Sequence, residues 1–343
     1  MNEKTRDMSI LYVEDDVAIR EYMCGYLNNR FERVLVAENG AAGFDSFRKN
    51  APDIVMTDVR MPVMDGLEMI RSITKTNHKA AIIITSAYDE SRYLLGAIEL
   101  GISHYLLKPF DSCKVDASLR HCIESVRKAQ SARERENSVD EAFLYTITSL
   151  ARAAEANDEE TGNHIQRVGN YCAAICRQIG YSDEMAEIIA QQSQLHDVGK
   201  IHIPPETLKK PGQLTEAEMV LMREHTIFGV KIIGNHPRLE IARTIAQYHH
   251  ERWDGSGYPF GICGTAIPMN ARIVTIADTY DALRNKRSYK PSLDHDAVCR
   301  IIMEGDGRTE PSHFDPDLLQ TFKKTNREFD EIYEQFATVE SES

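Results

Sequence analysis

Two adjacent histidines, His249 and His250, begin the stretch of the chain that is richest in residues able to do chemistry, and a glycine-rich turn follows them. A His-Asp pair, His196 and Asp197, precedes them in the chain, and a further carboxylate, Asp278, comes after them. Imidazole and carboxylate groups are the ligands that hold divalent first-row metals at sites where water is activated. The types and order of these residues therefore predict a hydrolytic metal site.

Two more histidines, His164 and His225, complete the set of candidate ligands. Glu160 and His164 are four residues apart and would share one face of a helical turn, with Arg167 further along that face. His225 stands alone between the two motifs that contain paired ligands. The chain has 12 histidines, and an ordinary core or surface imidazole is the commoner explanation for any single one. The metal interpretation therefore depends on the whole set.

The order and spacing of these motifs resemble the HD-GYP family, which comprises metal-dependent phosphodiesterases within the HD hydrolase superfamily. The resemblance covers residues 142–336 and includes the segment from His313 to Pro316. The approach to that segment, residues 305–312, is longer than the family pattern, but it contains no predicted ligand. The resemblance implies a divalent metal centre, for which iron or manganese fits best and nickel or zinc also fits.

The resemblance also implies roles for single residues. Asp197 would bridge the metals and, together with Lys200, form the catalytic machinery. Lys200, Arg287 and Lys290 would contact substrate phosphate. Glu160 occupies the position that binds a third metal in some members of the family. Members with a carboxylate there tend to cleave both phosphodiester bonds of their cyclic dinucleotide and release GMP. The alternative for Glu160 is a solvated glutamate near the start of a helix. The implied metal ligands are Glu160, His164, His196, Asp197, His225, His249, His250 and Asp278.

The first part of the chain alternates short apolar runs with helical patterns. Strands are expected at 9–13, 33–37, 53–57, 81–86 and 104–107. This alternation predicts an α/β fold with a doubly wound, five-stranded parallel sheet and with functional groups at the carboxyl ends of the strands. The residues at those ends are Glu14, Asp15, Asp58, Ser86 and Lys108. Three carboxylates at one edge repel one another unless a cation lies among them, so we expect a Mg²⁺ pocket there.

This arrangement resembles the flavodoxin-like receiver domain of two-component response regulators, over residues 8–125. The implied roles are phosphoacceptor for Asp58, Mg²⁺ binding for Glu14 and Asp15, switch residues for Ser86 and Tyr105, and phosphate contact for Lys108. Asp16 falls just past the acidic pair and receives no role. A receiver domain implies a cognate sensor histidine kinase as partner.

A continuous helix is expected from residue 115 onward. Val115, Leu119, Cys122, Val126 and Ala129 recur at intervals of four and three, which is typical of a coiled-coil seam. A seam this short is equally consistent with packing on the chain's own receiver domain. Residues 127–136 are a mixed-charge run, predicted to be a solvated helical linker. The expected domains are a receiver (1–125), a helical linker (126–141) and an all-α HD-type domain (142–343), with a possible homodimer through the linker helix.

Composition narrows the range of partners. A formal net charge of −13 disfavours a nucleic-acid binder, which needs a basic face. The seven cysteines are scattered without a CxxC pair, which fits a reducing cytosol. No stretch approaches the ~20 apolar residues of a membrane span, and the first residues lack the apolar core of a signal peptide. We expect a cytoplasmic protein.

Together the two resemblances imply a response regulator that hydrolyses cyclic di-GMP to the linear dinucleotide or GMP at a two- or three-metal centre, under the control of phosphorylation at Asp58. The loop 255–259 is expected to shape the substrate face, because its glycines permit close backbone approach; a plain turn is the alternative. A hydrolase of another cyclic nucleotide is a second candidate, since no predicted ligand reads a base. The third is a non-catalytic signalling module, which the filled ligand positions disfavour.

Overall fold

The computed structural model describes residues 5–76, 78–87, 102, 104–109, 111–155, 163–285 and 292–341. Its contacts divide the chain into two compact units, Met1–Ser138 and Val139–Ser343, which we call the sheet unit and the helical unit. Three predicted site residues, Glu160, Arg287 and Lys290, lie outside the described residues. The domain boundaries at residues 125 and 142 stay a prediction.

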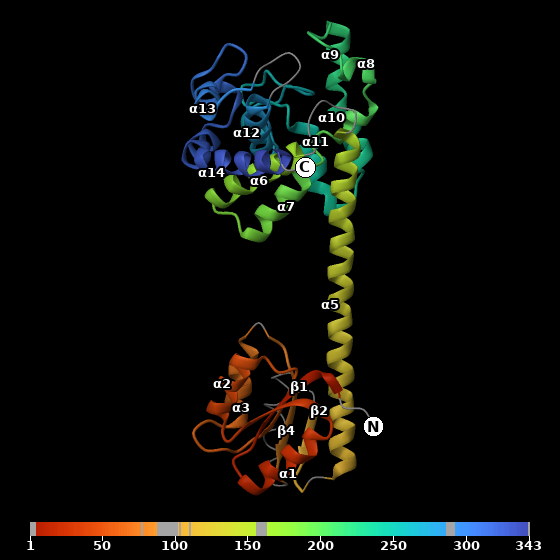
Figure 1. Cartoon of the computed structure of the whole chain (residues 1–343), viewed down its shortest axis with the longest axis vertical. Helices are drawn as coiled ribbons and strands as arrows, with labels where there is room; N and C mark the ends of the chain where they lie inside the picture. The colour runs from red at the N-terminus through yellow and green to blue at the C-terminus, as the bar shows by residue number, and fades with distance from the viewer. Residues whose placement is uncertain are drawn as a thin grey trace. The chain divides into compact units, whose positions relative to one another are not determined.

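The sheet unit contains five parallel strands in the order β2-β1-β3-β4-β5 (Figure 1). The strands are β1 (Thr5–Val13), β2 (Phe31–Ala37), β3 (Ile54–Asp58), β4 (Ala81–Ser86) and β5 (His104–Leu107). The described helices between them are α1 (Val17–Asn28), α2 (Gly40–Asn50) and α3 (Gly66–Thr74). The predicted α/β fold is therefore confirmed, although β1 begins four residues before the expected start.

Alternate residues of β1 enter different cores, as the period of a strand requires. Ile10 and Tyr12 pack with α1 and with the helix that follows β5. Leu11 and Val13 pack with α2 and α3. Helices thus cover both faces of the sheet, which leaves its carboxyl edge to carry polar residues.

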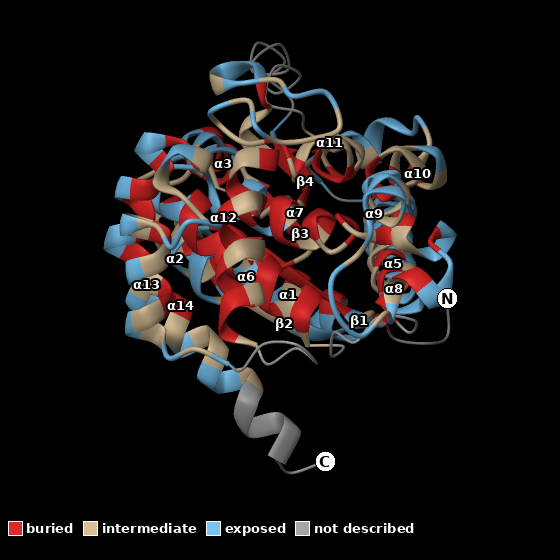
Figure 2. Ribbon diagram, turned by 90° about the horizontal axis from the view of Figure 1, so that it is seen from above, coloured by how far each residue is buried: buried red, intermediate tan, exposed pale blue. Residues whose placement is uncertain are grey.

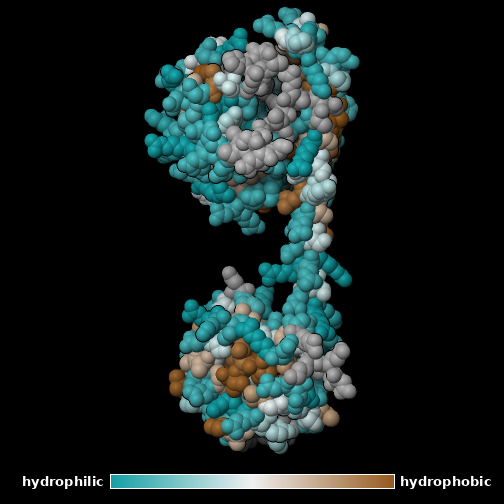
Figure 3. Space-filling model, viewed as in Figure 1, coloured by the Kyte–Doolittle hydropathy of each residue, from teal (hydrophilic) through white to brown (hydrophobic). Residues whose placement is uncertain are grey.

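Helix α5 (Ser112–Glu155) follows the sheet, so the prediction of a continuous helix is confirmed, while its division into a linker at 126–141 stays a prediction. Val115, Leu119 and Cys122 are buried in the core of the sheet unit, at 1% exposure or less. Of the two explanations for the seam, packing on the chain's own sheet is the one observed, because these side chains fill the space beside β1 and α1. Residues 127–139 are exposed all round the helix, and Figure 3 shows a largely hydrophilic surface along them.

This packing corrects one expectation about self-association. Val115, Leu119 and Cys122 cannot form an intermolecular seam while they are buried in the sheet unit. A homodimer through the linker helix would need the exposed segment 127–139 instead, and it stays a prediction.

The helical unit is built around α6 (His164–Gln178), most of which is buried (Figure 2). Stacked and edge-on aromatic contacts join Tyr171 of α6 to Tyr280 and Phe329, with ring centroids 4.4–5.3 Å apart. The other helices are α7 (Asp183–Ser193), α8 (Pro205–Leu208), α9 (Glu216–Arg223), α10 (His225–Ile233), α11 (Glu240–Tyr248), α12 (Met269–Arg284), α13 (His295–Glu304) and α14 (Pro316–Ser341). Short 3₁₀ turns join several of them, and the described part of this unit contains no strand, so the expected all-α domain is confirmed.

Among the helices of the described residues, none combines the length and the hydropathy that crossing a membrane requires.

The packing of α5 generates a stability prediction. We expect Leu119→Ala to destabilise the sheet unit by about 2–5 kcal/mol, because it leaves a cavity in a closed core. Calorimetry of the full chain should show that the melting temperature falls for the sheet unit and stays unchanged for the helical unit. Arg133→Ala, on the exposed part of the same helix, is the control and should change stability by no more than about 0.5 kcal/mol. An unchanged melting temperature with a smaller mass in scattering would instead assign Leu119 to an intermolecular seam.

Candidate metal centre

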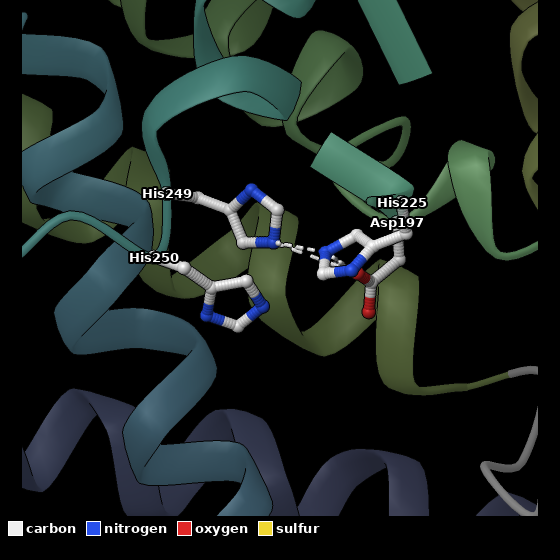
Figure 4. Close-up of side chains that lie close together, drawn as sticks. All are labelled: Asp197, His225, His249 and His250. Atoms are coloured by element: carbon white, nitrogen blue, oxygen red, sulfur yellow. Dashed lines mark hydrogen bonds and ion pairs between the residues drawn. The ribbon is translucent and has the colours of Figure 1, made fainter. Parts of the chain in front are cut away.

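Seven of the eight predicted metal ligands come together in the helical unit, in two groups. The first group is Asp197, His225, His249 and His250 (Figure 4). The second group is His164, His196 and Asp278. Within each group the ligand atoms lie within 4.8 Å of one another. The eighth predicted ligand is Glu160, outside the described residues.

The ends of helices carry most of these side chains. His164 and His225 are the first residues of α6 and α10, and His249 follows the last residue of α11. His196 and Asp197 lie in the turn between α7 and a 3₁₀ turn, Val198–His202. Helix ends from distant parts of the chain thus meet at one place, where the turns direct imidazoles inward.

Gly199 explains why the turn after Asp197 can approach α10 so closely. A Cβ atom at this glycine would lie 2.5 Å from the backbone nitrogen of Gly229 and would overlap the carbonyl of His225. Any other residue would push this turn away from the start of α10. Gly199 therefore helps to hold Asp197 beside His225.

Asp197 connects the two groups. Its Oδ1 atom lies 3.2 Å from His225 Nε2 and 3.5 Å from His249 Nε2, contacts drawn in Figure 4. Its Oδ2 atom lies 3.3 Å from His196 Nε2 in the second group. The Lys200 ammonium is 2.7 Å from the same oxygen. One carboxylate thus presents one oxygen to each group, which is the arrangement that a bridging ligand requires.

Hydrogen bonds at Nδ1 orient three of the imidazoles. The Nδ1 atom of His196 lies 2.8 Å from the carbonyl of Ser193, and that of His225 lies 2.7 Å from the carbonyl of Met222. His249 Nδ1 lies 3.1 Å from the carbonyl of Ile245. Because a carbonyl only accepts, each Nδ1 must carry the proton, and the lone pair of Nε2 faces the other ligands. This tautomer is the one that binds a metal through Nε2.

His164 is oriented by a residue that the sequence did not single out. Its Nδ1 atom lies 2.7 Å from Oδ2 of Asp281, a fully buried carboxylate on α12. Arg167 donates to both oxygens of Asp281, at 2.7 and 2.9 Å. The only signal in the sequence is spacing, because Arg167 lies one turn after His164 and Asp281 one turn after Asp278.

The charges of the cluster favour a cation. Burial alone would lower the pKa of His196, but Asp197 and Asp278 outweigh it and raise that pKa. Burial would likewise keep Asp197 neutral, but Lys200 and His196 hold its pKa well below the usual range. Burial lowers the pKa of His225 to about 4 and, with the neighbouring rings of His249 and His225, also lowers that of His250. These rings are therefore neutral near pH 7 and present nitrogen lone pairs.

Two buried donor atoms support metal binding independently. Among the described residues, His196 Nε2 and Asp197 Oδ1 make no hydrogen bond of good geometry, although they lie 3.3 and 3.2 Å from an atom of another ligand. Buried polar atoms are seldom left in this state, because the loss of solvation costs about 1–3 kcal/mol each. A divalent cation coordinated by nitrogen and oxygen would satisfy both atoms, so the donor set fits a first-row metal.

The glycine-rich loop folds back onto the histidine pair. The amide of Tyr258 donates to the carbonyl of His250 at 3.1 Å, and the amide of Phe260 donates to Glu251 Oε1 at 2.7 Å. The Tyr258 ring stacks on His250, with centroids 4.7 Å apart and an interplanar angle of 28°. A Cβ atom at Gly257 would lie 2.5 Å from Glu251 Cα, so only glycine permits this approach. The loop therefore packs against a predicted ligand, and its part in shaping the substrate face stays a prediction.

The longer approach, residues 305–312, and His313 directly after it contact the same loop. The amide of Trp253 donates to the carbonyl of His313 at 2.8 Å, and the Ser312 hydroxyl donates to Asp254 at 2.9 Å. The longer approach thus supports the base of the loop and places no described side chain among the ligands.

A second acidic cluster lies at the carboxyl edge of the sheet. Oxygens of Glu14, Asp15 and Asp58 lie within 4.8 Å of one another. The Lys108 ammonium reaches into it, 2.8 Å from Glu14 and 2.5 Å from Asp58. Burial raises the pKa of Glu14 despite the nearby Lys108. Carboxylate oxygens of this kind suit Mg²⁺.

The remaining predicted residues of the sheet unit have distinct positions. Ser86 is buried at the end of β4, and Tyr105 is half-buried on β5 beside Ile84. Asp16, which received no role, caps α1 by accepting the amide of Ile19. The sequence analysis assigned no role to Tyr12, but its hydroxyl donates to Glu14 at 2.9 Å.

Comparison with known proteins covers both units. The family described as "HD domain" matches residues 148–318, and "Response regulator receiver domain" matches residues 10–120. The "Cyclic di-GMP phosphodiesterase" of Thermotoga maritima is 32% identical over 95% of this chain and 92% of its own length. The "Cyclic di-GMP phosphodiesterase response regulator RpfG" of Xanthomonas campestris pv. campestris is 34% identical, over 84% of this chain and 79% of that protein. The "3'3'-cGAMP-specific phosphodiesterase 2" of Vibrio cholerae is 42% identical, over 51% of this chain and 33% of that protein.

The donor geometry predicts a metal-dependent stability. We expect Mn²⁺ at about 100 times its Kd to stabilise the helical unit by about 2.7 kcal/mol per site, because the ion binds only the folded cluster. Scanning calorimetry should show the shift in wild type and its reduction in His196→Gln. His202→Gln is the matched control, because His202 stacks on Phe228 and belongs to neither group. Equal shifts in both variants would contradict the assigned site.

Proposed function

This chain belongs to the response regulators that join a receiver domain to an HD-GYP domain, and on that premise we propose that it hydrolyses cyclic di-GMP under the control of Asp58. The main support is the position of Asp197, whose two oxygens face different ligand groups. Such a bridge is what a two-metal phosphodiesterase needs. The names of relatives aligned over nearly the whole chain point to the same substrate.

The chemistry follows from the ligands. When bound, a pair of divalent metals would lower the pKa of a coordinated water to ~7 and would stabilise charge developing on the phosphoryl oxygens. Asp197, Asp278 and the five histidines would hold that pair. Lys200, whose ammonium lies 2.7 Å from Asp197, would contact the substrate phosphate beside it. Arg287 and Lys290 complete the proposed phosphate contacts. Iron or manganese suits the mixed nitrogen and oxygen donors.

A second candidate differs in substrate. The 42% identical relative named for 3'3'-cGAMP aligns with half of this chain, and none of the described ligands recognises a nucleobase. Hydrolysis of another cyclic dinucleotide would use the same residues in the same roles. Parallel assays with cyclic di-GMP and 3'3'-cGAMP separate the two candidates. A module that acts without catalysis would turn over neither.

The proposal predicts the effect of losing the bridge. We expect Asp197→Asn to lower the turnover of cyclic di-GMP at least 10³-fold, comparable to the loss of a principal electrostatic group. Nucleotide chromatography on the metal-loaded full chain measures this. The receiver should still accept phosphate, because its core is separate from the helical core. A variant with near-normal turnover and depleted metal would rule out metal-dependent hydrolysis.

Control by Asp58 is proposed to act through α5. Its start contributes Leu119 to the core of the sheet unit, and its end contributes Ile147 and Ala151 to a cluster with Leu195 and Val198, which flank His196 and Asp197 in the chain. A phosphoryl group adds roughly 1.5–2 negative charges beside Lys108. That charge can shift a two-state element to which α5 is attached.

We therefore expect a phosphoryl analogue such as beryllofluoride to change turnover in wild type and to have no effect in Asp58→Asn. Ala132→Pro interrupts α5 within its exposed stretch, at a cost of about 3 kcal/mol in helix stability. It should abolish the response while leaving unstimulated turnover intact. Equal turnover with and without the analogue in wild type would contradict control through Asp58.

Glu160 is proposed to determine how far the reaction proceeds. A third cation near it would place positive charge where the linear dinucleotide, which is more negative than the cyclic diester, has to bind. We expect Glu160→Ala to lower metal content by about one equivalent and to make the linear product accumulate. Glu159→Ala is the neighbouring control. The same ratio of linear dinucleotide to GMP in wild type and Glu160→Ala would exclude this role.

A further inference from the structure

Four of the predicted ligand histidines have an Nδ1 partner among the described residues, and they are not held in the same way. His196, His225 and His249 have Nδ1 against neutral backbone carbonyls. His164 has Nδ1 against the carboxylate of Asp281, at 2.7 Å. A carboxylate partner fixes the ring as a carbonyl does, and it also raises the basicity of the opposite nitrogen. His164 is therefore the stronger donor of the four.

Asp281 is fixed in place by several donors. It is fully buried on α12, and both of its oxygens accept from the Arg167 guanidinium on α6. Asn285 donates to Oδ2 at 2.7 Å, and the Tyr171 hydroxyl lies 3.3 Å from Oδ1. These partners leave the carboxylate little freedom to rotate. The Arg167 guanidinium forms an ion pair with it at 2.7 Å.

The opposite nitrogen of His164 belongs to the second ligand group. Its Nε2 atom lies 3.7 Å from Asp278 Oδ1, which is also 3.9 Å from His196 Nε2. In the first group, Nδ1 of His225 and Nδ1 of His249 lie against backbone carbonyls. The influence of Asp281 is therefore confined to the second group.

We propose that Asp281, supported by Arg167, is a positioning residue for the metal at the second group. It fixes the tautomer and the orientation of His164 and strengthens His164 as a donor, so the two metal positions are electronically unequal. The proposal rests on the function proposed above only in requiring that both groups bind metal.

Two explanations for the Asp281–Arg167 pair make different predictions. If the pair served only to join α6 to α12, its loss would lower the stability of the metal-free chain and leave metal affinity unchanged. If Asp281 positions His164, its loss weakens the second group and spares the first. Partners of a metal-binding histidine typically change metal affinity by about 10–100-fold.

The test is a titration of the metal-free full chain with Mn²⁺, in which the signal of free aqueous Mn²⁺ in electron paramagnetic resonance reports binding. We expect two classes of site in wild type. Asp281→Asn keeps the size of the side chain but removes its charge, and it should weaken one class about 10–100-fold and leave the other unchanged. His164→Ala should weaken the same class.

Two further variants keep the result interpretable. Tyr171→Phe removes a contact with Asp281 without touching His164, and its binding curve should match wild type. Asp281→Asn combined with Arg167→Gln leaves no unpaired buried charge. This double variant therefore tests the role of Asp281 in metal binding if the single variant does not fold. The double variant should show the same selective loss.

An Asp281→Asn chain that binds Mn²⁺ like wild type would overturn the proposal, and so would equal weakening of both classes in a folded chain. Failure of the proposed function is a separate result. A wild type with two Mn²⁺ classes that leaves cyclic di-GMP intact refutes the function and retains the role of Asp281. If the wild type hydrolyses cyclic di-GMP and Asp281→Asn leaves Mn²⁺ binding unchanged, the function stands and the role of Asp281 is refuted.

Discussion

The arrangement of the helical unit depends on one constraint, which is that imidazoles and carboxylates are concentrated at a buried place. Asp197 lies between two such groups and is itself held anionic by Lys200 and His196. Carboxylates in a low-dielectric interior require nearby positive charge, and the neutral rings of His225 and His250 supply none. A divalent cation answers this requirement and at the same time provides the chemistry for attack on a phosphodiester.

The fold meets the constraint by using helix ends. Turns before α6 and α10 and after α11 direct His164, His225 and His249 inward, and Gly199 permits the turn carrying Asp197 to approach α10 closely. In the sheet unit the carboxyl edge of parallel strands plays the same part and gathers Glu14 and Asp58 around Lys108. Helix α5 contributes side chains to the core of each unit, so a change at the acidic edge has a covalent route to the helices that carry the ligands.

The parallel sheet, the helical unit and the set of metal ligands could be predicted from the sequence, because apolar runs mark each strand and the histidine motifs are dense and ordered. The parts that could not be predicted depend on tertiary contacts. In the sequence nothing distinguishes Asp281 from an ordinary helical aspartate, because its partner His164 lies 117 residues away in the chain. Tyr12 sits in an apolar strand, where nothing indicates that its hydroxyl reaches Glu14. The heptad-like spacing of Val115 and Leu119 predicts an apolar stripe but not which surface it covers, and the sheet covers it here.

The central claim, that Asp197 bridges two metals, is tested most directly by anomalous diffraction from metal-loaded crystals at the absorption edge of the bound metal. Apart from any third metal at Glu160, the account predicts a pair of anomalous peaks ~3.5–4 Å apart on either side of the Asp197 carboxylate. One peak should lie within coordination distance of His225, His249 and His250, and the other within that of His164, His196 and Asp278. A single peak in fully loaded crystals, or two peaks that do not share Asp197, would contradict it.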